Sequence, residues 1–144
     1  MSSSIRELFI REEKARKQLI SPVLLDNGLT PGQGQAGILN NLLKEDHISQ
    51  KELSVRCHMD TTTMSRAIDN LEKLGLLNRE INPESRRSTL ICLTEEGRGK
   101  ALNIRAAFEQ LESILGKDIP REDMETFHRV LMKVCENLEK GILS

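Results

Sequence analysis

The hydrophobic pattern of the chain changes its period near residue 75, and this change constrains the fold more than any other feature. Before it, apolar residues recur at helical spacing over about 30–43, 50–57 and 61–74. After it, two short apolar runs flank a polar loop over 82–87. Three short helices followed directly by a β-hairpin predict a helix-turn-helix with a wing.

Capping residues support these helix boundaries. Thr30 with Pro31 is predicted to begin the first helix. Ser49 and Glu52 have the spacing of a capping box at the second helix, and Asp60 is the candidate N-cap of the third.

Further helices are predicted at both ends of the chain, over 4–20, over 95–116 and after Pro120. Their apolar residues repeat in steps of three and four, which favours packing against a partner chain. An intrachain helical hairpin is the alternative. The residues expected to mediate dimerisation are Phe9, Phe108, Leu111, Leu115, Phe127, Leu131, Val134 and Leu138.

Together these elements predict a mainly α fold with a small β-hairpin wing. The 144 residues suit one domain, 1–144. Within it, residues 30–94 are expected to form the winged helix-turn-helix, and residues 1–29 and 95–144 the dimerisation helices.

The charge of the whole chain gives little support to nucleic-acid binding. Lys and Arg number 21 against 22 Asp and Glu, for a net charge of −1. Aromatic residues make up 2%, which argues against a stacking platform for single strands. The local charge differs, because Arg66 is the only charge within 61–68, and Arg86 and Arg87 are the only charges within 85–94. A neutral protein can present a cationic footprint in this way.

These segments are the ones that a winged helix directs at DNA. Short polar side chains of the third helix suit the major groove, where Arg66 could read guanine. Arg87 is expected to reach the minor groove, and the start of helix 50–57 to contact phosphates. The alternatives are an ordinary helical first turn and a solvated hairpin tip. The candidate DNA-binding residues are Ser49, Gln50, Lys51, Thr61, Thr62, Thr63, Ser65, Arg66, Asn70, Arg86 and Arg87.

Several short motifs follow one another in a specific order. They lie at 29–30, 35, 38–39, 48–53, 59–60, 71–79, 86–87 and 93–98. In this order and spacing the chain resembles the MarR family of winged-helix transcriptional regulators over nearly its whole length. The resemblance implies a homodimer that binds a pseudo-palindromic operator in double-stranded DNA. It also implies a pocket for a small-molecule effector between the DNA-binding and dimerisation regions.

One position departs from the family pattern. The family usually carries an aspartate two residues before the wing arginine, where it helps to orient that arginine. Here the position is Ser85, followed by Arg86 and Arg87. Either Glu84 takes over this role or the wing is looser.

Cysteines and histidines give weak signals for redox or metal sensing. The organic-peroxide branch of the family uses a cysteine in the first helix with nearby tyrosines, whereas residues 1–56 contain no Cys and the chain has no Tyr. A redox role stays open for Cys57, against a small packed residue, while Cys92 and Cys135 are expected in the core. His47, His58 and His128 are scattered, so no metal or cofactor is expected.

No motif of an enzyme is present, since the sequence contains neither a phosphate-binding loop nor a metalloprotease or nucleophile-elbow motif. The sequence therefore predicts a dimeric, sequence-specific DNA-binding regulator, a ligand-responsive repressor and not an enzyme. Without a signal peptide or membrane span, a cytoplasmic location is expected. A winged-helix protein-interaction module without DNA binding is the alternative.

Overall fold

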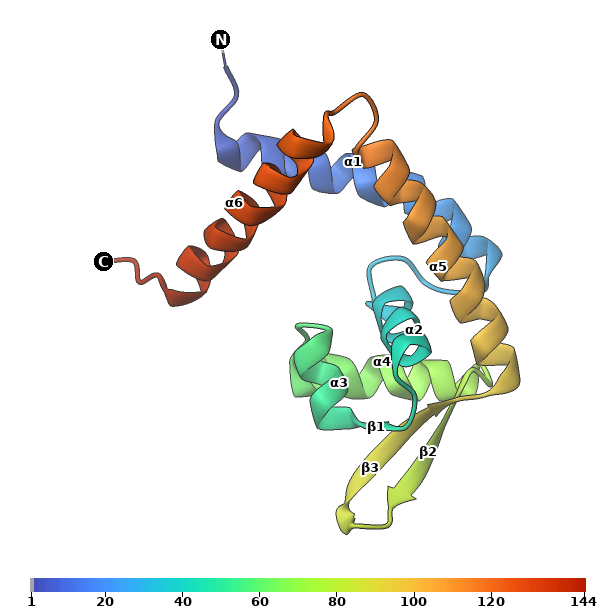
Figure 1. The fold of residues 1–144 in the computed structure, drawn as a ribbon. Helices are drawn as coiled ribbons and strands as arrows, with labels where there is room; N and C mark the ends of the chain where they lie inside the picture. Colours follow the sequence, from blue (N-terminus) through green and yellow to red (C-terminus); the bar gives the residue numbers. More distant parts are fainter. Residues whose placement is uncertain (1) are drawn as a thin grey trace. The chain divides into compact units, whose positions relative to one another are not determined.

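The computed structural model describes residues 2–144, which form two compact units. The first unit ends at Leu111 and the second begins at Glu112. Figure 1 shows the elements in chain order, which are α1 (Ile5–Asp26), α2 (Gln35–Lys44), β1 (Ile48–Ser49), α3 (Gln50–Arg56), α4 (Thr61–Lys73), β2 (Leu77–Asn82), β3 (Ser85–Leu93), α5 (Glu95–Leu115) and α6 (Arg121–Lys140).

The sheet of the first unit has three antiparallel strands in the order β1-β3-β2. The β2–β3 hairpin extends away from α2, α3 and α4 as a wing (Figure 1). The short strand β1 pairs Ile48 with Ile91 of β3. The predicted fold class, a mainly α winged helix-turn-helix, is confirmed. Strand β1 was not predicted, because two residues carry no readable alternation.

The hydrophobic core lies where α2, α3 and α4 meet the base of the sheet and the first half of α5. Each of these elements contributes the apolar face expected from its period. The largest fully buried side chains are Ile38, Leu39, Leu42, Leu53, Met64, Ile68, Leu71, Leu77, Ile91 and Ile104.

Helix α2 begins four residues later than predicted, so the expected start at Thr30–Pro31 is wrong. Gly32 and Gly34 adopt left-handed backbone with φ of 85° and 73°, which a continuous right-handed helix does not allow. The Thr30 N–H donates to the side-chain oxygen of Gln35, the first residue of α2, at 2.8 Å. Thr30 is therefore bonded to the helix but is not its N-cap, which is Gly34.

The wing also differs from the prediction. The polar loop was expected over 82–87, but Ser85–Arg87 belongs to β3, and only Pro83 and Glu84 connect the strands. The strand extends further because β-pairing continues to Asn82 opposite Ser85 after an irregularity at Ile81. Both wing arginines therefore lie on a strand.

The two cysteines predicted in the core have different outcomes. Cys92 is buried, as expected, but Cys135 is exposed because α6 has no buried residue in this unit. Phe108 packs against the core of its own chain. Among the helices of residues 2–144, none has the length and apolarity to cross a membrane. The division into a winged region and dimerisation helices stays a prediction.

The junction between the winged helix and α5 is unusually tight. The Thr94 N–H donates to the Leu76 carbonyl at 3.1 Å, and the Thr94 hydroxyl donates to Gly75 O at 2.7 Å and accepts from Gly97 N at 2.9 Å. Gly97 is buried, and a Cβ added there would overlap the Leu76 carbonyl oxygen. The start of α5 therefore lies against the start of β2 only because residue 97 has no side chain.

We expect Gly97→Ala to lower the free energy of unfolding by about 1–3 kcal/mol, the usual penalty for overpacking a rigid site. The matched control is Gly99→Ala on the same helix, where an added Cβ meets no atom of the described chain within 4 Å. That change should be neutral or stabilising by about 0.5–1 kcal/mol. Urea denaturation of both variants checks this, and equal stabilities would contradict the packing argument.

Candidate nucleic-acid interface

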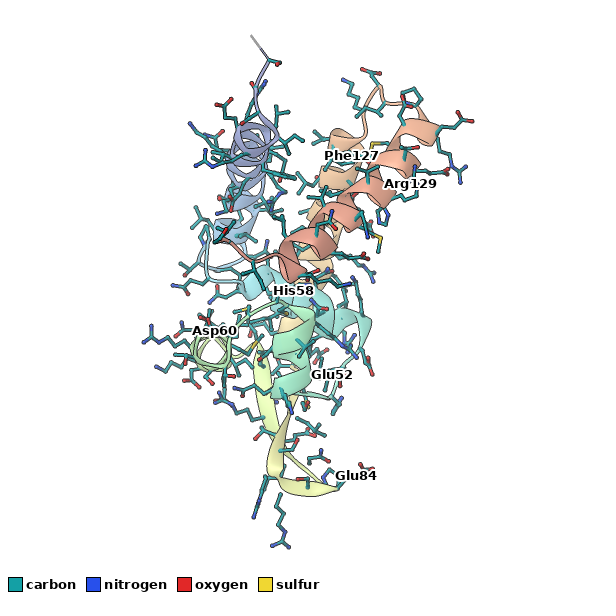
Figure 2. The ribbon with its side chains drawn as sticks, turned by 90° about the vertical axis from the view of Figure 1, so that its left-hand side faces the viewer. Glu52, His58, Asp60, Glu84, Phe127 and Arg129 are labelled. Carbon is teal, nitrogen blue, oxygen red and sulfur yellow. The ribbon has the colours of Figure 1, made fainter. Side chains whose placement is uncertain are left out.

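The N-terminus of α4 is fixed by its predicted cap. Asp60 Oδ1 accepts from the Thr63 backbone N–H at 2.7 Å, and Asp60 Oδ2 accepts from the Thr63 hydroxyl at 2.9 Å. Both bonds favour the ionised carboxylate, so they hold the pKa of Asp60 below its usual range, with the backbone bond as the larger cause. Asp60 marks this end of the helix (Figure 2).

The buried face of α4 determines which side chains point outward. Its buried residues are Met64, Ala67, Ile68 and Leu71. Thr61, Thr62, Arg66 and Asn70 are exposed, as predicted for a helix that presents one face to a groove.

Three other candidate residues are occupied within the protein. The Thr63 hydroxyl is engaged by Asp60, and Gln50 Nε2 of α3 donates to Ser65 Oγ of α4 at 2.8 Å. This bond ties α3 to α4 and sets the relative placement of the two helices. Sequence reasoning treated these side chains only as candidate DNA contacts, because nothing in the spacing shows which polar groups meet across the helix pair.

The structure brings the start of α3 beside the wing. A groove of about 400 Å³ is lined by Ser49, Gln50, Lys51, Arg87, Ser88 and Thr89. Ser49 is the N-cap of α3 and accepts from Glu52 N at 3.1 Å. The other half of the predicted capping box is not formed, because the Glu52 carboxylate accepts from Arg56 at 2.6 Å instead. Candidate residues almost forty positions apart thus share one surface.

The cations of this surface lack acidic partners. Within residues 2–144, no ion pair involves Lys51, Arg66, Arg86 or Arg87, and the three arginines are exposed. Their positive charges are therefore available to an anionic ligand.

The two acids within α4, Asp69 and Glu72, share one cation. Arg79 of β2 bonds Asp69 at 2.6 Å and Glu72 at 3.1 Å. These pairs reduce the repulsion that the two carboxylates would exert on a phosphate backbone. Sequence reasoning noted the acids only as lying outside the DNA-facing segments, because their partner is on a different element.

The hairpin tip is organised by Asn82. Its side-chain oxygen accepts from Glu84 N at 3.0 Å, and its amide donates to Ser88 Oγ at 3.3 Å. Glu84 lies at the tip (Figure 2), and no ion pair in the described chain joins it to a wing arginine. The suggestion that Glu84 replaces the family's usual aspartate is thus not supported, and Asn82 braces the turn instead.

Cys57, at the end of α3, is half-buried. Burial raises the pKa of its thiol above the ordinary value, and the bond from Asn41 Nδ2 to Sγ at 3.5 Å opposes this only in part. A raised pKa leaves less thiolate at neutral pH, and the thiolate is the reactive form. The structure therefore favours a packing role for Cys57.

The geometry defines a winged helix-turn-helix protein with a recognition helix, a supporting helix and a wing on one surface. Residues 27–88 match the sequence model of the MarR family. A curated relative, the uncharacterised HTH-type transcriptional regulator YdgJ of Bacillus subtilis, is 26% identical over 106 residues, which cover 74% of this chain. The aligned part spans 65% of that relative, slightly less than two thirds of its length.

Solved structures share the fold. The S. aureus MepR–DNA complex has a TM-score of 0.86 at 22% identity, covering 94% of this chain and 99% of that chain. The PcaV transcriptional regulator of Streptomyces coelicolor, in complex with its natural ligand, has a TM-score of 0.79 at 20% identity, covering 94% and 98%. The winged helix-turn-helix region of the chain is therefore similar in sequence to the MarR family, and the chain shares its fold with these solved structures.

The Asp60 cap predicts that the folding stability of the protein depends on pH. Because the folded pKa of Asp60 is lowered, its stabilising effect is present above the unfolded pKa of about 3.9 and is lost as the pH falls through the folded value. Asp60→Asn keeps a capping oxygen but has no charge to lose. Its melting temperature should lie below that of the wild type at pH 7, and the two should converge in acid, as followed by circular dichroism. A constant gap from pH 7 to pH 3 would contradict this role of the carboxylate.

Proposed function

We propose that the protein is a transcriptional regulator that binds double-stranded DNA in a sequence-specific manner. The observation that carries this proposal is the set of unpaired cations on α4, the start of α3 and the wing, beside two acids of α4 whose charge Arg79 compensates in part. A surface of this kind attracts phosphates although the net charge of the chain is −1.

Each part of the surface has a separate role in the proposal. The exposed threonines and Arg66 of α4 enter the major groove, where the guanidinium bonds O6 and N7 of guanine. Arg87 enters the minor groove from the wing, and Arg86 contacts the phosphates. Lys51 and backbone amides at the start of α3 contact the phosphate backbone.

The functional form in this proposal is a homodimer. Apolar side chains remain exposed on the terminal helices, including Ile5 of α1 at 71%, and Phe127 and Leu138 of α6 at 53% and 73%. A partner chain that covers these faces removes apolar surface from water. Two recognition helices then meet successive major grooves, with half-site centres about 34 Å apart.

We further propose that the regulator is a repressor that responds to a small-molecule effector, works in the cytoplasm and has no catalytic activity. The similarity to the MarR family and the ligand complex of the structural neighbour PcaV support this proposal. The principal alternative is a winged-helix protein-interaction module, for which the unpaired arginines would have no anionic partner to bind.

The DNA proposal is tested by fluorescence titration with a duplex from upstream of the protein's own gene and with a scrambled duplex of equal length. Arg87→Ala should weaken binding to both duplexes and reduce the salt slope by about 1. Arg66→Ala should reduce the binding free energy on the upstream duplex by about 1–3 kcal/mol. It should therefore also reduce the difference in affinity between the upstream and the scrambled duplex. The matched control is Lys117→Ala, which removes an exposed cation outside the winged helix. It should change neither the affinity for either duplex nor the salt slope.

Wild-type binding that is weak, equal on both duplexes and insensitive to salt would contradict the proposal and favour the interaction module. Unchanged affinity in both arginine variants would contradict the assignment of the interface while leaving DNA binding itself standing.

The dimer is tested by sedimentation equilibrium. Phe127→Glu places a charge on the apolar face of α6, and we expect it to weaken dimerisation by about 2 kcal/mol or more. Arg129→Ala is the control, because residue 129 lies two positions away and thus on the opposite side of the helix (Figure 2). A wild-type protein that is monomeric at all concentrations, or equal dimerisation in both variants, would rule out this interface.

A further inference from the structure

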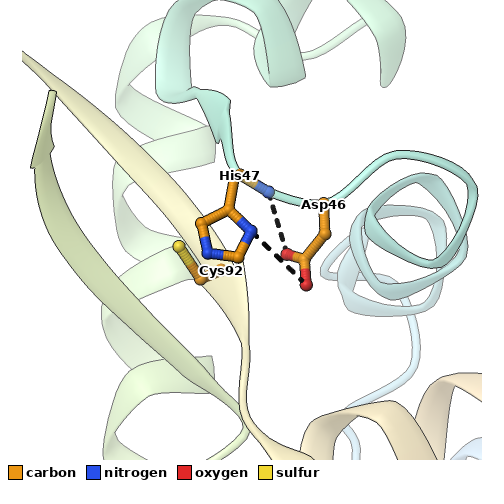
Figure 3. A group of neighbouring side chains, drawn as sticks. All are labelled: Asp46, His47 and Cys92. Atoms are coloured by element: carbon orange, nitrogen blue, oxygen red, sulfur yellow. Dashed lines mark hydrogen bonds and ion pairs between the residues drawn. The ribbon is translucent and has the colours of Figure 1, made fainter. Parts of the chain in front are cut away.

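A second cluster of reactive side chains lies at the base of the wing. Strands β1 and β3 pair Ile48 with Ile91 and Ser49 with Leu90. Continued by one residue, this antiparallel register brings His47 opposite Cys92. Figure 3 shows the imidazole of His47 between the side chains of Asp46 and Cys92.

The ligand atoms of these three residues converge. One donor atom each from Asp46, His47 and Cys92 lies within 4.8 Å of the others. Asp46 Oδ2 is 3.8 Å from His47 Nδ1, and Glu80 Oε2 of β2 is 3.8 Å from His47 Nε2. Ligands bound to Zn²⁺ at 2.0–2.3 Å lie about 3–4 Å apart, so the cluster needs to contract only slightly.

The turn before β1 is held in a conformation that presents these groups. His47 has φ of 56°, a left-handed backbone that is uncommon for a residue with a Cβ. Asp46 Oδ1 stabilises it by accepting from His47 N and from Leu93 N, each at 2.9 Å. The second oxygen, Oδ2, then faces the imidazole and contacts Arg98 at 3.2 Å. Because the Arg98 side chain is half exposed, it is free to withdraw when a cation takes its place.

The charges around the cluster also favour a cation. Cys92 is only 3% exposed, and the carboxylates of Asp46 and Glu80 lie near its thiol. A bound divalent metal would stabilise the Cys92 thiolate and release the thiol proton.

We propose that Asp46, His47 and Cys92 form a site for a divalent transition-metal ion of the Zn²⁺ class. A thiolate and an imidazole select such an ion over Mg²⁺ or Ca²⁺, which take oxygen ligands. The ion links the turn between α2 and β1 to strand β3 of the wing. The histidine spacing along the sequence did not predict this site, because Asp46 and His47 meet Cys92 only through the strand pairing.

The test is a Co²⁺ titration of the reduced, full-length protein, followed by absorption spectroscopy and by displacement with Zn²⁺. Cobalt bound to a thiolate gives a sulfur-to-metal charge-transfer band in the near ultraviolet. We expect this band in the wild type, its loss in Cys92→Ser, and its retention in Cys135→Ser, the control that removes an exposed cysteine.

A second variant guards against misfolding of Cys92→Ser. His47→Asn changes an exposed side chain and keeps a residue type that tolerates the left-handed backbone. It should weaken Co²⁺ binding at least about tenfold, or about 1.4 kcal/mol, while its circular dichroism spectrum stays that of the wild type. The proposal is overturned by the absence of a charge-transfer band in the wild type, by a band of full strength in Cys92→Ser, or by unchanged affinity in His47→Asn. None of these outcomes depends on DNA binding.

Discussion

The pairing of β1 with β3 is the contact on which both proposed sites depend. It contains only two residue pairs, Ile48 with Ile91 and Ser49 with Leu90. Because Ser49 is also the N-cap of α3, the strand ends and the helix begins at the same residue. The pairing therefore fixes the start of α3 beside the wing, where Lys51 and Arg87 border one groove. On the other side of Ile48 it places His47 opposite Cys92.

The distribution of ion pairs explains how a chain of net charge −1 presents a cationic surface. Arg56 and Arg79 are each paired with two carboxylates, while the arginines of α4 and the wing have no acidic partner in the described chain. Pairing near the interface compensates part of the negative charge of these acids. Net charge is a sum over the whole chain, whereas a DNA backbone responds to the charges within about 10 Å.

Much of this arrangement follows from local sequence signals. The helical period fixed the buried faces of α2 and α4, and the Asp60 cap and Gly75 marked both ends of the recognition helix. These signals are local, because a helix forms its own hydrogen bonds and its caps lie within one turn. The exposed positions of Thr61, Thr62, Arg66 and Asn70 followed from the same period.

What the sequence could not predict arises from contacts between elements. The bond from Gln50 to Ser65, the neutralisation of Asp69 by Arg79 and the meeting of His47 with Cys92 each join residues more than nine positions apart. Helix α2 started late for a different reason, since the two left-handed glycines outweighed the capping preference of Thr30. A strand of two residues is too short to show a period. The sequence therefore did not predict β1, although its pairing with β3 positions both proposed sites.

Hydroxyl-radical footprinting on the DNA upstream of the gene decides whether α4 and the wing hold DNA together, because it reports where the protein lies on each strand. We expect two protected half-sites about one helical turn apart, with minor-groove protection at their outer edges that disappears in Arg87→Ala. Protection that is absent at low salt, or outer protection that persists without the Arg87 guanidinium, would contradict this expectation.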